Sequence, residues 1–177
     1  MNDEADRVLV RDERPEDAAE IAEVTRLAFV DHPDAGLTEG RIIEALRAAD
    51  ALSVSLVAEH TGRVVGHIGF STVEISDGSR GWFGLGPLSV APAMQGRGIG
   101  SRLVIEGLAR LHSVGASGCV VLGDEGFYGR FGFDDDHDLV LQSVPQTFFH
   151  ALKFTPGQPH GRVTFHPVFS RVAVQGE

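Results

Sequence analysis

A glycine-rich turn between an apolar run and an amphipathic helix constrains this chain more than any other segment. The turn, residues 95–100, reads QGRGIG. Glycine has no Cβ, so its backbone can adopt positive φ and approach a ligand closely. After the turn, Val104, Leu108 and Leu111 fall on one helical face. We therefore predict a strand, a tight turn and a long helix between Leu85 and Ser113.

The start of this helix is suited to an anion. The first N–H groups of a helix have no intrahelical partner, and they coincide with the positive end of the helix dipole. A negative charge there is stabilised by about 0.3–1 kcal/mol even at an exposed site. Arg97 adds a fixed positive charge within the turn. We interpret the turn as a cradle for the pyrophosphate of a nucleotide-like cofactor; the simpler alternative is a flexible turn that only leads into a helix.

Three phosphate-binding loops compete for this assignment. A P-loop requires Lys followed by Ser or Thr, and the only lysine of the chain is Lys153. A dinucleotide-binding loop requires G-x-G-x-x-G, whereas Gly96, Gly98 and Gly100 form G-x-G-x-G. The pattern Q/R-x-x-G-x-G/A is matched by Gln95 with Gly98 and Gly100. In this respect the turn resembles the acyl-CoA loop of the Gcn5-related N-acetyltransferases.

Composition places the chain among soluble globular proteins and argues against several partners. With 177 residues, of which 42% are hydrophobic and 23% charged, it fits one domain with a substantial core. A net charge of −10 argues against nucleic acid, because phosphate binding needs a basic face. The acidic start MNDEADR does not match a secretory signal, and no apolar run could cross a bilayer. We expect a cytoplasmic protein that binds neither nucleic acid nor membrane.

Cysteine and histidine usage leads us to expect neither an internal disulfide nor a metal. Cys119 is the only cysteine and lies in the apolar run CVVL, which favours a buried small side chain over a nucleophile. The eight histidines show neither i, i+4 pairing nor cysteine partners, so we predict no metal site. The phenylalanine-rich C-terminal part favours core packing or a homodimer surface.

Hydrophobic periodicity and turn residues predict an ordered set of elements. A helix opens at Pro15 and ends near Phe29, residues 31–36 form a loop, and a second helix runs from the N-cap Thr38 to Ala49. Predicted strands cover residues 8–11, 53–59, 63–71, 83–90, 119–122, 139–141, 148–154 and 161–169.

Two features of these strands bear on the site. Gly84, Gly86 and Pro87 are unusual inside a central strand, and they indicate a bulge or a ligand that runs beside the backbone. The run at residues 119–122 follows the long helix, so a crossover would make it a parallel neighbour of the strand before the glycine turn.

The order of these elements is that of the Gcn5-related N-acetyltransferases, and three segments resemble motifs of that family. Residues 85–90 (LGPLSV) with Pro92 resemble its fourth strand, residues 95–100 its pyrophosphate loop, and residues 128–133 (YGRFGF) its Y-x-x-x-G-F segment. The resemblance covers residues 7–154. The ending FHPVF, with LGD before the tyrosine, is similar to a bacterial subgroup of predicted acetyltransferases.

The resemblance implies a fold and a domain organisation. The fold class is α/β (α+β), with a mixed, mostly antiparallel sheet of six to seven strands, a splayed central parallel pair and about four flanking helices. We expect residues 1–177 to form a single N-acetyltransferase domain, with its core over residues 7–154 and a C-terminal strand extension over residues 155–177.

The resemblance also implies an acetyl-CoA-dependent N-acyltransferase that acetylates a primary amine of a small molecule or peptide by direct attack. The pantetheine arm would lie along the main chain of the fourth strand, where a backbone N–H would polarise the thioester carbonyl. The implied cofactor-binding residues are Leu88, Ser89, Val90, Gln95, Gly96, Arg97, Gly98, Ile99, Gly100 and Ser101. A non-catalytic acyl-CoA-binding sensor or interaction domain is the alternative, and a nucleotide-dependent oxidoreductase is a third hypothesis.

Tyr128, the only tyrosine, is the implied catalytic residue. The departing CoA thiolate needs a proton, and an unperturbed tyrosine pKa of about 10 lies close to that of an alkyl thiol. A packing role with a structural hydrogen bond is the alternative. Residues 83–86 lack the glutamate that some members use as a base. His67, Glu74 and Asp124 are conceivable bases, as is deprotonation through ordered water or binding of a neutral amine.

The acceptor is not defined by any sequence motif. The resemblance places its pocket at residues 30–37 and 142–147, and neither segment has a distinctive charge pattern. The connection before Tyr128 is short and lacks the asparagine that is frequent in the family, which removes one usual pantetheine contact.

Overall fold

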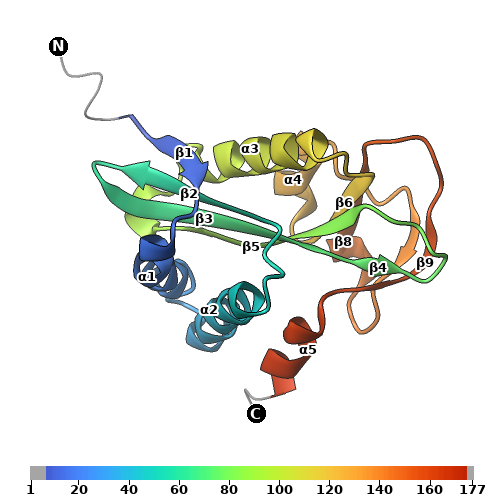
Figure 1. Ribbon diagram of the computed structural model, residues 1–177, viewed down its shortest axis with the longest axis horizontal. Helices are drawn as coiled ribbons and strands as arrows, with labels where there is room; N and C mark the ends of the chain where they lie inside the picture. The colour runs from blue at the N-terminus through green and yellow to red at the C-terminus, as the bar shows by residue number, and fades with distance from the viewer. Residues whose placement is uncertain (1–6, 175–177) are drawn as a thin grey trace.

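A mixed six-stranded sheet forms the centre of the protein (Figure 1). The computed structural model describes residues 7–174, with the backbone alone for residues 33–37 and 172–174. The strands follow the order β1-β2-β3-β5-β6-β8, and only the β5–β6 pair of this sheet is parallel. Their bounds are β1 Leu9–Asp12, β2 Val54–His60, β3 Arg63–Thr72, β5 Trp82–Val90, β6 Gly118–Leu122 and β8 Phe149–Lys153.

A three-stranded sheet of order β4-β9-β7 continues the structure at one end (Figure 1). Its strands are β4 Glu74–Ile75, β7 Asp138–Val140 and β9 His160–Thr164, with β9 antiparallel to β4 and parallel to β7. Ile75 and Val163 of this sheet share a buried cluster with Trp82 and Phe149 of the main sheet. The two sheets therefore have a common hydrophobic core.

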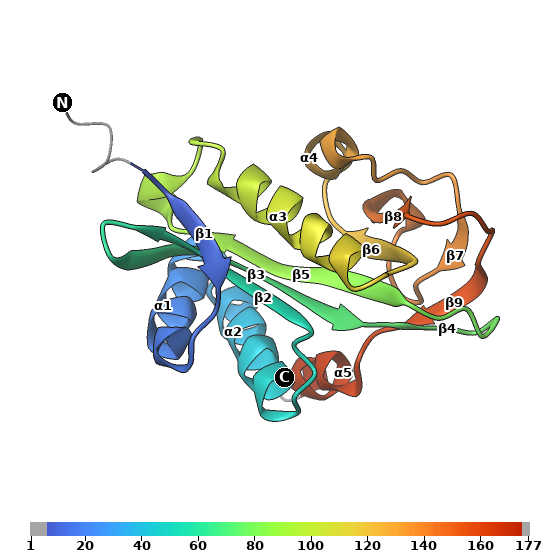
Figure 2. The same cartoon turned by 45° about the horizontal axis from the view of Figure 1, so that its top comes forward.

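Helices cover both faces of the main sheet (Figures 1 and 2). Helices α1 (Ala18–Ala28) and α2 (Pro33–Ala48) lie on one face, and α3 (Ile99–Ser113) lies on the other. The short helix α4 (Glu125–Tyr128) follows β6, and α5 (Pro167–Val174) packs against α2. Short 3₁₀ turns span Pro15–Asp17, Pro92–Met94, Gly129–Phe131 and Gln146–Phe148.

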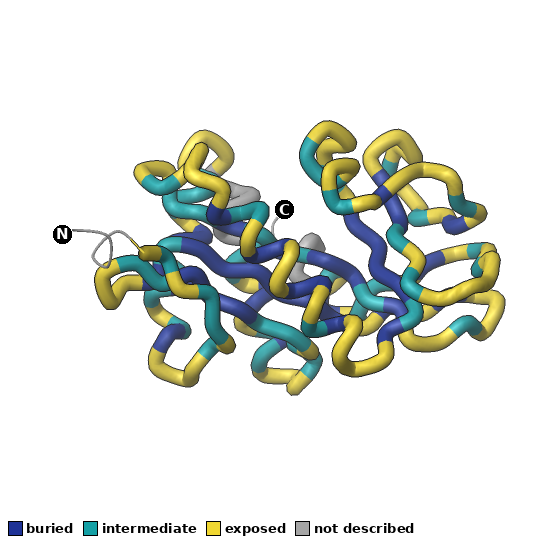
Figure 3. Tube along the Cα trace, turned by 90° about the horizontal axis from the view of Figure 1, so that it is seen from above, coloured by how far each residue is buried: buried dark blue, intermediate teal, exposed yellow. Residues whose placement is uncertain are grey.

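The burial of apolar side chains explains these layers. In Figure 3 the buried segments run along the central strands, while exposed segments form the outer helix faces and turns. Leu103 and Leu111 of α3 are fully buried against Leu56 and Phe70 of the sheet. Burying a side chain of this size contributes roughly 1.5–3 kcal/mol, which selects the apolar face of each helix. No helix within residues 7–174 is long and apolar enough to span a bilayer.

The predicted fold class is confirmed, and most predicted elements are present. The parallel pairing of β5 with β6 matches the expected crossover, and the predicted hairpin between β2 and β3 turns at Thr61 and Gly62, both with positive φ. Cys119 is fully buried in β6, as its apolar setting predicted.

Two predicted boundaries are wrong. Residues 33–36 are helical rather than a loop, and His32 rather than Thr38 is the N-cap of α2. Pro33 can occupy the first helical position because its missing N–H would be unpaired there anyway. The late strand, predicted over residues 161–169, ends at Thr164. Helix α5 begins at Pro167, which again occupies a first helical position, and the His166 Nδ1 accepts the Val168 N–H at 3.2 Å.

A buried polar cluster holds the C-terminal end of α2 against the sheet. Arg47 of α2 donates from Nε to Glu13 Oε1 at 2.6 Å, and the hydroxyl of Ser55 donates to Glu13 Oε2. The Ser55 Oγ also lies 2.8 Å from Nε2 of the fully buried His67. Burial opposes ionisation of Glu13, but its neighbours His67, Arg47 and Ser55 outweigh this effect and lower the Glu13 pKa from 4.5 to about 2.

The Glu13 cluster predicts an acid-sensitive stability. A carboxyl whose folded pKa is depressed stabilises the fold above its unfolded pKa, and that contribution is lost as the pH falls through the folded pKa. Glu13→Gln should therefore lower the free energy of unfolding at neutral pH by roughly 2–3 kcal/mol. The difference from the parent protein should shrink between about pH 4.5 and about pH 2. Urea denaturation across this range measures it.

Glu23→Gln is the matched control, because Glu23 forms an exposed ion pair with Arg26 on α1. We expect this variant to unfold like the parent protein at every pH. A destabilisation by Glu13→Gln that stays constant from neutral pH to about pH 2 would contradict the assigned linkage.

Candidate active site

The site is built where β5 and β6 separate. The parallel pairing runs from Trp82 opposite Gly118 to Leu85 opposite Val121. Beyond that point β5 continues to Val90 and pairs with β3 alone. Its main-chain groups on the β6 side are therefore without a strand partner over residues 86–90.

A bulge in β5 marks the point of separation. Ile68 of β3 pairs with Leu88 and Phe70 pairs with Leu85, so Gly86 and Pro87 together lie opposite Gly69. Gly86 has a φ of 143°, and Pro87 has no N–H to contribute to a ladder. The bulge predicted from these two residues is confirmed.

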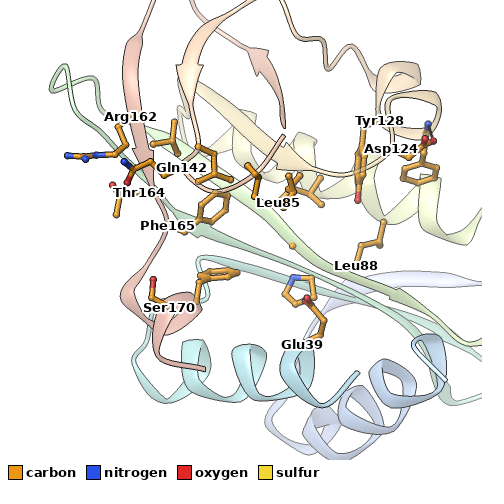
Figure 4. A pocket seen from close by; sticks show the side chains of 18 of the residues that line it. Glu39, Leu85, Leu88, Asp124, Tyr128, Gln142, Arg162, Thr164, Phe165 and Ser170 are labelled. Carbon is orange, nitrogen blue, oxygen red and sulfur yellow. Dashed lines mark hydrogen bonds between the residues drawn. The ribbon is translucent and has the colours of Figure 1, made fainter. Parts of the chain in front are cut away.

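A cavity of about 1120 Å³ opens at this point (Figure 4). Its floor is the bulged segment of β5, and its walls come from α2, α4, α5, β9 and the segment after β7. The lining residues are Phe29, Glu39, Leu85, Gly86, Pro87, Leu88, Leu122, Asp124, Phe127, Tyr128, Leu141, Gln142, Val144, Arg162, Val163, Thr164, Phe165, Phe169 and Ser170. A cavity of this size accommodates a drug-sized molecule.

Tyr128 projects its hydroxyl into the cavity from α4 (Figure 4). The side chain of Asp124 caps this helix by accepting the Phe127 N–H at 2.9 Å. The Tyr128 ring packs edge-on to the rings of Phe127 and Phe133, at centroid distances of 4.9 and 5.9 Å. It also lies against Gly123, where a Cβ would collide with the ring. No hydrogen bond joins the Tyr128 hydroxyl to another residue of the described chain, so the hydroxyl is free to meet a ligand.

The cavity changes the acidity of Tyr128. The pKa of Tyr128 is raised to about 12. Burial is the main cause, and the neighbouring Cys119 and Glu39 make smaller contributions in the same direction. The phenol is therefore protonated throughout the neutral range. An unperturbed pKa of about 10 would lie close to that of an alkyl thiol, whereas the raised Tyr128 pKa lies above it.

The glycine turn has the conformation of an anion cradle. Gly96 and Gly98 have φ values of 73° and 77°, and α3 begins at Ile99 directly after them. The Gln95 side chain closes the turn by donating from Nε2 to the Val90 carbonyl at 3.0 Å. A Cβ on Gly96 or Gly98 would meet nothing within 4 Å, so a ligand can approach this backbone. The turn therefore fits a phosphate group at a helix N-terminus.

The other residues predicted to bind the cofactor differ in whether their side chains or only their backbone groups are accessible to a ligand. Leu88 lines the cavity, whereas the side chain of Ser89 is buried in the sheet and that of Ile99 in the core, so these two residues can contribute only backbone groups. The Ser101 hydroxyl lies 3.5 Å from a guanidinium nitrogen of Arg130. Arg130 stacks on Phe127, 4.8 Å from the ring centre, and adds a cation at the helix start that the predictions did not include.

Glu39 is the site residue that the sequence predictions missed. It lies on α2 and lines the cavity on the side opposite Tyr128 (Figure 4). The predicted acceptor segment stopped at Leu37 because the helix was expected to start at Thr38. A helix that starts at Pro33 places Glu39 within its second turn instead. The second predicted acceptor segment does contribute, through Gln142 and Val144.

Of the three conceivable bases, none is free in the cavity. Asp124 lines the cavity but its carboxylate caps α4. His67 lies beneath the sheet surface in the Glu13 cluster, and Glu74 is exposed on β4. No group of three or more potential metal ligands gathers among the described residues.

Comparison with known proteins identifies the class. The model of the acetyltransferase (GNAT) family matches residues 18–133. The uncharacterized N-acetyltransferase YhbS of Escherichia coli K12 is 37% identical over 135 residues, which cover 75% of this chain and 78% of YhbS. The crystal structure of YhbS in complex with CoA has a TM-score of 0.88 at 32% identity, covering 97% of this chain and 96% of that chain.

A further solved relative is a GNAT family acetyltransferase from Brucella melitensis in complex with acetyl-CoA. It is 50% identical, with a TM-score of 0.81, and the alignment covers 92% of this chain and 98% of that chain. The fold and these matches are those of an N-acetyltransferase. This chain belongs to the acetyltransferase (GNAT) family. The family resemblance and the enzyme class predicted from the sequence are thereby confirmed.

The only tyrosine of the chain permits a direct test of the site electrostatics. Tyrosinate absorbance should show that Tyr128 is half-ionised at about pH 12 in the folded protein. In the urea-unfolded chain the midpoint should lie at about pH 10. Because the unfolded chain ionises first, the protein should lose stability between these two values. Glu39→Gln should lower the folded pKa, since the negative charge of Glu39 helps to raise it. Glu44→Gln, an exposed site on the same helix, should leave the pKa unchanged.

Proposed function

We propose that this protein transfers an acetyl group from acetyl-CoA to a primary amine of a small molecule or peptide by direct attack. The observation that carries the proposal is the cavity at the separated strands, which places Tyr128 beside the unpaired part of β5. The glycine turn follows at the end of the same strand. Bound CoA and acetyl-CoA in the two solved relatives support the choice of donor.

The β5 backbone would hold the pantetheine arm. Residues 86–90 pair with β3 on one side only, so their other main-chain groups can bond an extended ligand as they would bond a strand. Leu88 lines the cavity, and a backbone N–H at this position would polarise the thioester carbonyl. CoA supplies the activated acyl thioester, and the protein supplies position and charge.

The start of α3 would hold the pyrophosphate. The turn at Gly96 and Gly98 directs its backbone towards open space, and the unpaired N–H groups of the helix start there. Arg97 and Arg130 add positive charge on exposed side chains. Such a site would bind a phosphate anion through several charge-assisted hydrogen bonds, supported by the two cations.

Tyr128 would donate the proton that the departing sulfur needs. Its hydroxyl points into the cavity and stays protonated at neutral pH. The negative charge of Glu39 is one of the causes that raise the Tyr128 pKa to about 12. A cation held by Glu39 would lower the Tyr128 pKa towards the value of a thiol, which makes proton donation easier when the acceptor is bound.

Tyr128→Phe tests the enzymatic role. It removes the hydroxyl without changing the ring packing against Phe127 and Phe133, so we expect an unchanged dissociation constant for acetyl-CoA. The turnover number should fall by about a hundredfold or more. Calorimetry and a free-thiol assay give the two quantities. A fully active variant would remove Tyr128 from the mechanism, whereas binding of NAD in preference to CoA would overturn the proposal.

Gly98→Ala tests the phosphate cradle against a matched control. Gly98 and Gly115 lie at opposite ends of α3 with φ values of 77° and 76°, and a Cβ at either meets nothing within 4 Å. Alanine should therefore destabilise the fold similarly at both sites, by about 1 kcal/mol or more. Only Gly98→Ala should weaken CoA binding, by about tenfold. Equal CoA affinity in the two variants would exclude the turn from the binding site.

A further inference from the structure

The walls of the cavity away from Tyr128 are largely apolar. Three aromatic rings line these walls. Phe29 follows α1, Phe165 follows β9, and Phe169 lies on α5. Leu141 and Val144 come from the segment after β7. The side chain of Phe165 occupies the space over Gly84, where a Cβ would collide with it. A ligand seated here exchanges water for aromatic and aliphatic contacts.

Glu39 is the one carboxylate available in this cavity among the described residues. The other lining acid, Asp124, is engaged as the cap of α4. No hydrogen bond or ion pair joins Glu39 to another described residue, and burial raises the pKa of its carboxyl. The one lining cation of the described chain, Arg162, lies at the end of the cavity away from Glu39 and Tyr128 (Figure 4). A partly buried acid without a partner is costly unless a ligand supplies the opposite charge.

We propose that the acceptor is a primary amine with a single positive charge on an apolar body, and that its nitrogen is held between Glu39 and Tyr128. In this arrangement Glu39 both binds the ammonium group and accepts its proton. This inference rests on the proposed acetyl transfer and names the substrate class and the base for that reaction. Glu39 and Tyr128, which lie on opposite sides of the cavity (Figure 4), then form an acid–base pair.

The proton and electron balance of the reaction is simple. Glu39 takes one proton from the ammonium group, which frees the nitrogen lone pair. That lone pair forms the C–N bond to the acetyl carbon while the C–S bond breaks, and Tyr128 gives its phenol proton to the departing sulfur. The remaining excess proton on nitrogen restores Tyr128, and Glu39 releases its proton to solvent. A raised pKa makes Glu39 a stronger base towards the ammonium proton, whose pKa lies well above that of an ordinary carboxyl.

The same geometry disfavours acceptors with several charges. A polyamine or an aminoglycoside would place further ammonium groups against Phe165, Phe169 and Val144, where no free carboxylate is present among the described residues. Burying an unpaired ammonium group costs several kcal/mol. A monoamine with an aromatic or alkyl body places its charge at Glu39 and its carbon atoms along the apolar wall.

The test compares acceptors and variants in one free-thiol assay. Phenethylamine and hexylamine represent the proposed class, and spermidine and kanamycin represent multiply charged amines. We expect kcat/KM for the two monoamines to exceed that for the polycations by about tenfold or more. Glu39→Gln should lower kcat/KM for phenethylamine by about a hundredfold, with an unchanged dissociation constant for acetyl-CoA. Glu44→Gln, exposed on the same helix, is the control and should behave like the parent protein.

The pH profile separates a base from a merely structural residue. The acid limb of kcat/KM should be set by Glu39 and disappear in Glu39→Gln, while Glu39→Asp should retain it at reduced activity. The other titratable or charged groups that line the cavity among the described residues are Tyr128, Asp124 and, at the far end, Arg162. Burial is the main cause that raises the pKa of Tyr128 to about 12, and all three groups are present in Glu39→Gln, so a limb that disappears in this variant belongs to Glu39.

The outcomes distinguish this inference from the function on which it rests. If CoA binds and spermidine or kanamycin is the preferred acceptor, or if Glu39→Gln retains the activity of Glu44→Gln, the inference is wrong and the acetyltransferase proposal stands. CoA binding without turnover of either monoamine also counts against the inference. If neither CoA nor acetyl-CoA binds, the proposed function itself fails.

Discussion

The separation of β5 from β6 is the constraint on which the site depends. The two strands pair in parallel only as far as Leu85 and Val121. The bulge at Gly86 and Pro87 then turns β5 towards β3 alone, because two residues there oppose Gly69 and Pro87 has no N–H for a ladder. An unpaired strand edge inside a covered sheet requires a polar partner. The cavity floor, the glycine turn and the start of α3 all follow from the course of this one strand.

Two helices, α4 and α2, place a phenol and a carboxyl group on opposite sides of the cavity at that strand. Helix α4 carries Tyr128, and its ring can lie close to the chain because residue 123 is glycine. Helix α2 carries Glu39 and is held at its far end by the ion pair of Arg47 with the buried Glu13. The polar cluster therefore anchors the helix that carries Glu39. It fixes the helix that faces Tyr128 across the cavity.

Local signals predicted the conformation of the segments to which the acetyl-CoA donor is assigned. The glycine turn, the disturbed strand and Tyr128 each lie in short segments whose conformation is encoded by Gly and Pro at defined offsets. The acceptor side depended on two helix starts that the sequence predictions missed. Pro33 was assigned to a loop and Pro167 to a strand, but each begins a helix where its missing N–H costs nothing. Glu39 and Phe169 were therefore not connected with a pocket.

The sequence by itself determined the family, the fold class and the course of the chain around the glycine turn, because these depend on backbone rules and periodicity. Only the tertiary structure decided which titratable side chains line the same cavity. Glu39 and Tyr128 are separated by about half of the chain, and the raised pKa of each arises mainly from burial, which no local pattern encodes. No local pattern encodes the apolar wall of the cavity either, because the residues that follow α1, those that follow β7 and those of α5 come together only by tertiary packing.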